Sequence, residues 1–214
     1  MGMARTQLIE QLIHEGYLFT PRIVEAFTHI KRGDFIPPSL RENADTNVPL
    51  SIGWGQTISQ PLTVAFMLEL LRPEPGSIVL DIGYGSGWTT ALLAHIVSEE
   101  GRVGSGKVFA IERIPELAEF GKKNVAKYNF LEKGIAEMIC GDGTKGWEEH
   151  APFDCIHAAA SARNIPQPWK DQLRIGGRLV LPVENSIWLL IKKSQDGFEE
   201  HEYPGFAFVP LIEG

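Results

Sequence analysis

The ten residues from Ile78 to Gly87, Ile-Val-Leu-Asp-Ile-Gly-Tyr-Gly-Ser-Gly, constrain the fold of this chain more than any other stretch. A short apolar run, 78–82, ends in glycines at alternate positions, Gly83, Gly85 and Gly87, and a helical pattern follows. This order is typical of a buried parallel strand that turns tightly into a helix beneath a ligand. Because glycine allows close approach and positive φ, we expect the turn to form part of a binding site.

Two familiar nucleotide-binding loops do not fit this turn. The dinucleotide fingerprint needs a small residue three positions after its second glycine, and Trp88 stands there. The Walker phosphate loop needs Gly-Lys followed by Ser or Thr, which is absent. The remaining pattern, with Asp81 inside the strand, resembles the first motif of class I methyltransferases that use S-adenosylmethionine. A glycine-rich turn without a ligand and an NAD-dependent enzyme are the alternatives, and Trp88 disfavours the second.

Length and composition limit the classes of protein that fit. The chain has 214 residues, of which 43% are hydrophobic, so we expect residues 1–214 to form one domain. Within it, residues 1–60 would supply N-terminal helices and a lid over substrate and cofactor, and residues 61–214 the cofactor-binding αβ core.

Charge and cysteine content bear on partners and location. The net charge of −7 argues against a nucleic-acid partner. Two cysteines, Cys140 and Cys155, provide neither a disulfide framework nor the ligand spacing of a zinc site. No apolar run is long enough for a signal peptide or a membrane span. We therefore expect a cytoplasmic monomer without a membrane partner or a bound metal.

The N-terminal third is predicted to be mainly helical. Apolar spacing indicates a helix over 5–15 and a second one capped by Thr20, with Pro21 in its first turn. A Pro-rich connection, 34–38, and a polar loop, 41–48, follow. Residues 62–71 are apolar on almost every side and predict a buried helix for which Ser59 would be the N-cap.

From residue 78 onward strands and helices alternate, which predicts a parallel sheet with helices on both faces. We expect a doubly wound, mostly parallel α/β fold of the Rossmann-like methyltransferase class, with antiparallel strands at its C-terminal edge. A flexible loop is expected over 101–106, a turn at Gly176-Gly177, and a hairpin turn at Asp196-Gly197. The predicted strands are 78–82, 108–112, 136–140, 154–159, 178–183, 187–193 and 199–209, and the core helices 87–98 and 115–128.

Three acidic residues fall at or near the carboxyl ends of strands, where open α/β sheets bind ligands: Asp81, Glu112 and Asp142. Glu112 is placed to accept hydrogen bonds from ribose hydroxyls, and an exposed ion pair with Arg113 is its alternative. Asp142 can approach an adenine amine, although a simple Asp-Gly turn fits the local sequence almost equally well.

Over nearly its whole length the chain resembles the protein-L-isoaspartate O-methyltransferase family. Thr-Ile-Ser-Gln-Pro at 57–61, upstream of the glycine loop and joined to Glu-Arg-Ile-Pro-Glu-Leu, is the most selective part of the resemblance. The matching stretches are 35–38, Ile52-Gly53, 55–61, the glycine loop, 112–117, 141–144, Gly146-Trp147 and 208–211.

The resemblance implies an enzyme that methylates the α-carboxylate of isoaspartyl residues in damaged proteins or peptides, with S-adenosyl-L-methionine as cofactor. The methyl ester then collapses to a succinimide, and hydrolysis returns some normal aspartate. Ser59 carries over as the active-site serine. The residues expected to bind the cofactor are Thr57, Ile58, Asp81, Gly83, Tyr84, Gly85, Ser86, Gly87, Glu112, Asp142 and Gly143.

Such an acceptor needs little acid-base chemistry. An unperturbed carboxyl of this kind has a pKa of roughly 3.5, so it is already an anion at neutral pH. We therefore expect no catalytic His-Asp pair, and we interpret His157 as a packed or hydrogen-bonded residue. The small residues 158–161 leave room for a peptide backbone. They also lack the Asp or Asn with Pro-Pro and an aromatic that methyltransferases of DNA amines carry there.

Some positions depart from the family pattern. They are Asp45, Asn47, Ser51, Ala207 and Ile212, and they put the choice of acceptor in doubt more than the cofactor. Two alternatives stay open: a carboxyl methyltransferase with a different peptide or small-acid acceptor, and a module that binds S-adenosylmethionine without turnover. The N-terminal helices with residues 43–55 would form the lid.

Overall fold

A seven-stranded sheet forms the centre of the molecule, with the strand order β5-β4-β3-β6-β7-β8-β9. The computed structural model describes residues 3–98 and 106–211, so nearly all of the loop predicted at 101–106, and Ile212, lie outside the described residues. The strands are β3 (Ile78–Ile82), β4 (Lys107–Glu112), β5 (Ala136–Cys140), β6 (Phe153–Ala158), β7 (Leu173–Val183), β8 (Ser186–Lys192) and β9 (Phe198–Pro204).

The sheet is mostly parallel, as predicted. Strands β3 to β7 pair in parallel, whereas β8 is antiparallel to both of its neighbours. The chain moves outward from β3 through β4 to β5 and then returns to place β6 on the other side of β3. The strand order therefore reverses beside β3, which is where ligands bind in open α/β sheets.

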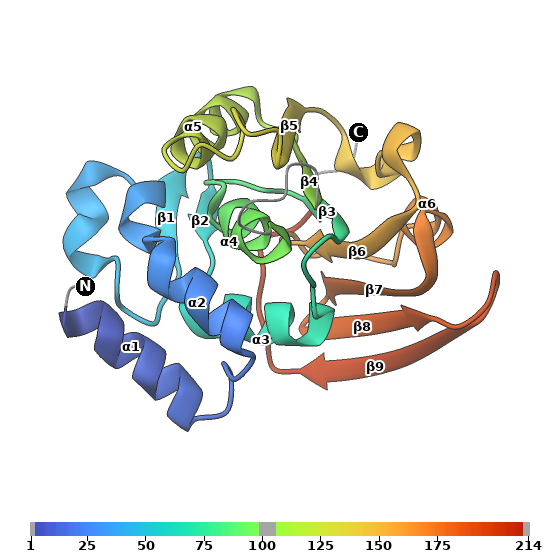
Figure 1. Cartoon of the computed structure of the whole chain (residues 1–214), viewed down its shortest axis with the longest axis horizontal. Coiled ribbons are helices and arrows are strands. Elements are labelled where there is room, and N and C mark those ends of the chain that lie inside the picture. Colours follow the sequence, from blue (N-terminus) through green and yellow to red (C-terminus); the bar gives the residue numbers. More distant parts are fainter. Residues whose placement is uncertain (1–2, 99–105, 212–214) are drawn as a thin grey trace.

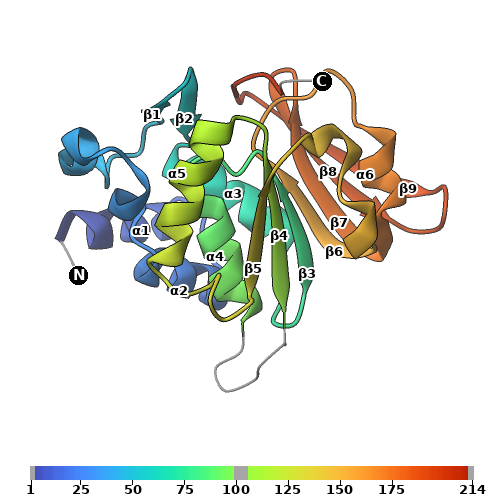
Figure 2. The ribbon, with the colours of Figure 1, turned by 90° about the horizontal axis from the view of Figure 1, so that it is seen from above.

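Helices cover the two faces of the sheet unequally, as Figures 1 and 2 show. One face carries α3 (Pro61–Leu71), α4 (Trp88–Val97) and α5 (Pro115–Ala126), with α1 (Met3–His14) and α2 (Pro21–His29) outside them. The other face carries the short α6 (Gln167–Asp171). Four 3-10 turns complete the helical elements described: η1 (Arg32–Phe35), η2 (Pro38–Asn43), η3 (Gly143–Lys145) and η4 (Glu148–His150).

Each face of the sheet has its own apolar core. The larger core joins the N-terminal helices to the sheet, since Leu12 of α1 and Leu92 of α4 are fully buried in the same cluster. The smaller core surrounds Trp169 of α6, whose indole N–H donates a 2.8 Å hydrogen bond to the carbonyl of Gly143. The N-terminal helices therefore pack against the helices that cover this face of the sheet.

A small hairpin that we did not predict lies beside the sheet. It consists of β1 (Leu50–Gly53) and β2 (Gln56–Ile58), which pair antiparallel. Its two-residue loop, Trp54-Gly55, has φ of 51° and 71°, the positive values of the tight turns that suit strand twist. The short strands and a tryptophan at a turn position explain why the pattern did not reveal it.

Two structural predictions in the second half of the chain were wrong, and one in the first half was partly wrong. The glycines Gly176 and Gly177 lie inside β7 at a register shift instead of preceding it. The last strand ends at Pro204, not at 209, because Gly205 takes a φ of 99° and turns the chain away. The polar loop expected over 41–48 begins within η2.

Candidate active site

A cavity of about 310 Å³ opens at the carboxyl ends of β3, β4 and β6, a size in the range of small-molecule sites. Segments far apart in the sequence form its walls: the strand β2 and start of α3, the glycine loop, the end of β4 with the start of α5, and the last described residues. Its lining includes Thr57, Ser59, Gly83, Gly85, Glu112, Gly143, Ala160, Phe208 and Pro210.

The glycine loop forms the floor of this cavity. The N–H of Gly83 donates a 2.8 Å hydrogen bond to the carbonyl of Ile111, which ties the loop to β4. Gly83, Tyr84, Gly85 and Ser86 all line the cavity, as expected for a ligand-binding loop. The Tyr84 hydroxyl donates to the carbonyl of Ala118 at 3.2 Å, and burial, aided by the Glu112 charge, raises the pKa of this phenol.

Gly87 has a different role from the one predicted. It does not line the cavity but precedes α4, with a φ of 85°. A Cβ at this position would lie 2.7 Å from the Val125 side chain and 2.8 Å from the Gly121 carbonyl. Glycine is therefore required here for close packing of α4 on α5.

Glu112 lies at the end of β4 with its carboxylate at the cavity wall. One oxygen accepts the N–H of Gly85 at 2.9 Å, and the other accepts the N–H of Ile114 at 3.0 Å. These bonds fix the carboxylate and leave further lone pairs for a ligand. The alternative ion pair with Arg113 is wrong: Arg113 lies 3.7 Å from the Asp142 carboxylate instead.

Asp81, which we expected to bind the cofactor, does not line the cavity. Its side chain is fully buried beneath the glycine loop. One oxygen accepts the hydroxyl of Thr90 at 2.6 Å, and the other lies 2.8 Å from Nδ1 of His157 on the neighbouring strand. A buried His-Asp pair therefore exists outside the cavity lining, and it joins β3, β6 and α4 below the site. His157 is hydrogen-bonded, as predicted.

The turn after β5 brings Gly143, but not Asp142, to the cavity lining. The carboxylate of Asp142 accepts hydrogen bonds from the hydroxyl and N–H of Thr144, at 2.7 and 3.0 Å. These bonds, together with the charge of Arg113, lower the pKa of Asp142. A Cβ on Gly143 would lie 2.6 Å from the Ile82 side chain, so glycine is required for the turn to approach β3.

Ser59 lies between β2 and α3 and lines the cavity beside Thr57 and Ile58. It is not the helix cap that we predicted. The N-cap of α3 is Gln60, and Asn47 supplies a capping oxygen from another segment by accepting the N–H of Leu62 at 3.0 Å. Asn47, although it departs from the family pattern, thus supplies an acceptor where α3 begins, and Pro61 occupies the first turn as expected.

Arg32, which sequence reasoning missed, supports this wall from below. Its guanidinium donates to the carbonyl oxygens of Ala44, Thr46, Val48 and Ser59, at 2.8 to 3.3 Å. Burial lowers the pKa of Arg32 to about 10, and the Asp45 charge opposes this shift. One arginine in a polar stretch gives no sequence signal that it serves four carbonyls.

The segment after β9 closes the remaining side of the cavity. Residues 207–211 line it, and Ser161 pairs with this segment by donating its N–H to the Val209 carbonyl and accepting the N–H of Leu211, both at 2.8 Å. Ala159 and Ala160 line the adjoining wall, as the small-residue pattern predicted. The wall also includes residues that we did not assign, among them Trp88, Thr89, Arg113 and Leu117.

The glycine loop, the fixed carboxylate of Glu112 at the end of β4 and the mostly parallel sheet define a Rossmann-like methyltransferase that uses S-adenosylmethionine. A structure from Plasmodium falciparum has the same arrangement with a TM-score of 0.87 and 25% identity, covering 97% of this chain and 98% of that one. That protein is described as a putative protein-L-isoaspartate O-methyltransferase in complex with S-adenosyl-L-homocysteine.

The family model for protein-L-isoaspartate (D-aspartate) O-methyltransferase matches residues 3–214. A relative of that name from Aeropyrum pernix is 44% identical, covering 98% of this chain and 79% of its own. Another from Staphylothermus marinus is 44% identical, covering 97% and 93%. The chain belongs to the protein-L-isoaspartate O-methyltransferase family. Among the described residues, no helix is long and apolar enough to cross a membrane.

Proposed function

We propose that this chain methylates the α-carboxylate of L-isoaspartyl residues in damaged proteins or peptides, with Ser59 as the catalytic residue. The observation that carries the proposal is a single cavity with two distinct walls. The glycine loop and Glu112 form one wall, and the polar strip of Thr57 and Ser59 forms the other. Small residues and the 207–211 segment border the space between them.

The cavity residues fit S-adenosyl-L-methionine. The backbone of Gly83 and Gly85 is open to the cavity, and the Glu112 carboxylate has lone pairs to accept ribose hydroxyls. Tyr84, Ser86, Thr57, Ile58 and Gly143 complete this set. When bound, the cofactor supplies an electrophilic methyl group on a positively charged sulfur.

The protein's own residues have to orient the acceptor carboxylate and keep water out of the cavity. The acceptor carboxylate is already an anion at neutral pH, so no residue needs to remove a proton. The Ser59 hydroxyl can donate a hydrogen bond that orients the carboxylate, while Trp88 and Leu117 contribute apolar wall that limits water. The buried pair of Asp81 and His157 lies outside the cavity lining and takes no part in proton transfer.

Two synthetic peptides that differ only in isoaspartate against aspartate test the reaction. Labelled methyl groups should enter the isoaspartyl peptide selectively and be lost in base. Ser59→Ala should lower turnover by about 10- to 100-fold, the loss of one hydrogen bond to a charged group, and bind S-adenosylhomocysteine as before. Ser194→Ala is the matched control, because Ser194 is exposed in the connection between β8 and β9 and does not line the cavity. Unchanged turnover in Ser59→Ala removes the serine from the reaction.

A different carboxylate acceptor is the second candidate, and Ala207 favours it. This residue lines the cavity at a position where family members often carry arginine, so the local charge toward an acceptor differs. Activity on another peptide or small acid with inertness toward isoaspartyl peptides would support this candidate. Binding of S-adenosylhomocysteine with no methyl transfer to any carboxylate would indicate a non-catalytic module.

We also propose that residues 1–214 act as one domain in which α1, α2 and the segment 43–55 serve as a lid. The shared core of Leu12 and Leu92 supports the single domain. Hydrogen exchange in the β1–β2 hairpin should slow when S-adenosylhomocysteine binds. The same exchange rates with and without ligand would exclude closure of this segment.

For partners and location we propose a monomer of the cytoplasm that binds no nucleic acid. The net charge of −7 supports the last point, and the two free cysteines, Cys140 and Cys155, fit a reducing compartment. Light scattering after gel filtration measures the mass. A value twice that of the chain would contradict the monomer.

A further inference from the structure

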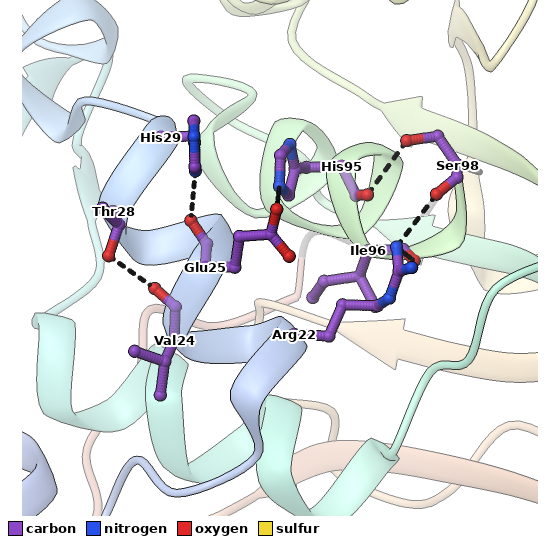
Figure 3. A network of polar contacts seen from close by, with 8 residues as sticks. All are labelled: Arg22, Val24, Glu25, Thr28, His29, His95, Ile96 and Ser98. Carbon is purple, nitrogen blue, oxygen red and sulfur yellow. Dashed lines mark hydrogen bonds and ion pairs between the residues drawn. The ribbon is translucent and has the colours of Figure 1, made fainter. Parts of the chain in front are cut away.

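Two histidines and a glutamate meet on the outer side of the helices α2 and α4, away from the cavity lining (Figure 3). One nitrogen each of His29 and His95 and one carboxylate oxygen of Glu25 all lie within 4.8 Å of one another. The imidazole rings are stacked, with centroids 5.2 Å apart and planes 18° apart. From this geometry we infer a binding site for a divalent transition ion of the zinc class.

The donor set suits such an ion. Imidazole nitrogen and carboxylate oxygen are common ligands of Zn²⁺, and three protein ligands with one open position form a recurrent zinc arrangement. Hard cations such as Mg²⁺ prefer sets made of oxygen alone. The site therefore selects a transition ion over Mg²⁺ or Ca²⁺.

A hydrogen bond orients His29 for this task. Its Nδ1 lies 2.9 Å from the backbone carbonyl of Glu25, one helical turn earlier. Because a carbonyl can only accept, Nδ1 carries the hydrogen, and Nε2 keeps its lone pair for a metal. Bonds of this kind set the tautomer of metal-binding histidines.

The packing of α2 against α4 places His95 close to Glu25 and His29. Glu25 and His29 are four residues apart on α2 and so share one face. His95 comes from α4, with Nε2 already 3.8 Å from the Glu25 carboxylate. Arg22 fixes the same helix pair by donating to the carbonyls of Ile96 and Ser98, at 3.3 and 3.0 Å.

Only small side-chain movements are needed for coordination. Ligand atoms in a tetrahedral zinc site lie about 3.3 Å apart, given bonds of about 2.0–2.1 Å. The carboxylate of Glu25 is half exposed, at 53%, and His29 is exposed, so both can rotate to close the remaining distance. His95 is 22% exposed and is the most constrained ligand.

The ion would join α2 to the helix that begins at the glycine loop. Trp88, the first residue of α4, lines the cavity. Phe27 of α2 packs edge-on against Trp88, with the ring centroids 5.5 Å apart. A bound ion would add a further link between α2 and α4, beyond the Phe27–Trp88 contact and the Arg22 hydrogen bonds, and would raise the stability of the fold. This site is independent of the proposed acceptor chemistry.

Titration of the untagged full chain with ZnCl₂ by calorimetry tests the site. We expect one ion per chain, and we expect Glu25→Gln and His29→Ala each to weaken binding by at least about 10-fold, the smaller loss known even for outer partners of metal ligands. His14→Ala, at an exposed histidine of α1, should bind as the original does. MgCl₂ should produce no binding heat.

Thermal unfolding supplies a second readout. Zinc at 100 times its dissociation constant should raise Tm by roughly 5–10 °C in the original protein and not in His29→Ala. His95→Ala should also lose the rise in Tm that zinc causes. If His95→Ala does not fold, Glu25→Gln and His29→Ala alone test the site. Absence of zinc binding, binding unchanged in Glu25→Gln and His29→Ala, or an equal loss in His14→Ala would overturn the site.

Discussion

The guanidinium of Arg32 donates a 3.1 Å hydrogen bond to the backbone carbonyl of Ser59, from beneath the wall that presents the serine to the cavity. The same group lies 5.5 Å from the ring centroid of Trp88, another cavity residue. Arg32 is only 3% exposed. It is therefore a positioning residue that fixes the path of the chain from 44 to 59 relative to α4.

Arg32→Lys should disturb the position of Ser59, although it keeps the positive charge. Lysine keeps the positive charge but not the planar fork that reaches carbonyls on several sides. We expect kcat for methyl transfer to fall at least about 10-fold, because small displacements of reacting groups are costly. S-adenosylhomocysteine affinity should stay within about 3-fold. Arg41→Lys, at an exposed arginine of η2, is the control. Equal loss of cofactor affinity and kcat would indicate general disruption instead.

Glu112→Gln tests the cofactor wall. The substitution keeps the shape of the side chain but removes the charge that would strengthen hydrogen bonds from ribose. S-adenosylhomocysteine affinity should fall by about 10- to 100-fold, as measured by calorimetry. Glu116→Gln, on the exposed side of α5, should leave affinity unchanged. An affinity that stays within a factor of three in Glu112→Gln would separate this carboxylate from the cofactor.

The hydrogen bonds of Asp142 predict that the stability of the fold depends on pH. Hydrogen bonds from Thr144, then the Arg113 charge, lower the pKa of Asp142 below its usual 3.8. A carboxyl whose pKa is lower in the folded state stabilises the fold fully above the unfolded value, and this stabilisation is lost as pH falls through the folded value. NMR titration should show the low midpoint, and Thr144→Val should raise it. A midpoint unmoved by Thr144→Val would refute the cause.

Glu69 should contribute to the attachment of the N-terminal helices. This buried carboxylate of α3 accepts the N–H groups of Phe19 and Thr20 at 2.8 Å and the Thr20 hydroxyl at 2.6 Å. Glu69→Gln should lower the free energy of unfolding by about 2 kcal/mol, measured in urea. Glu132→Gln, at an exposed site, should change it by less than about 0.5 kcal/mol. Equal effects of the two variants would contradict this role.

Local pattern predicted the elements whose shape depends on their own residues. The strands β3 and β5 have the predicted bounds, 78–82 and 136–140, because their short length and the turn residues around them favour strands over helices. Thr20 stands at the predicted N-cap of α2, but its hydroxyl bonds Glu69 instead of the helix. The position of the cap could be predicted from sequence, but its bonding partner, 49 residues further along the chain, could not.

In the candidate site, too, local pattern predicted some residues, and long-range contacts place the others. The glycine loop and Glu112 reach the cavity as expected, since strand ends fix their place. Asp81 faces away because its side chain points into the packing between sheet and α4, where Thr90 and His157 satisfy it. The closing segment 207–211 follows a path set by its pairing with Ser161, a long-range contact that gives no local signal.

That closing segment also makes the cavity depend on few contacts. Residues 207–211 form one side of the cavity, and they lie beyond β9 in the chain. Two backbone hydrogen bonds to Ser161 attach them to the segment that follows β6. The cavity can therefore lose one of its sides by local opening, while the strands of the sheet keep their hydrogen bonds.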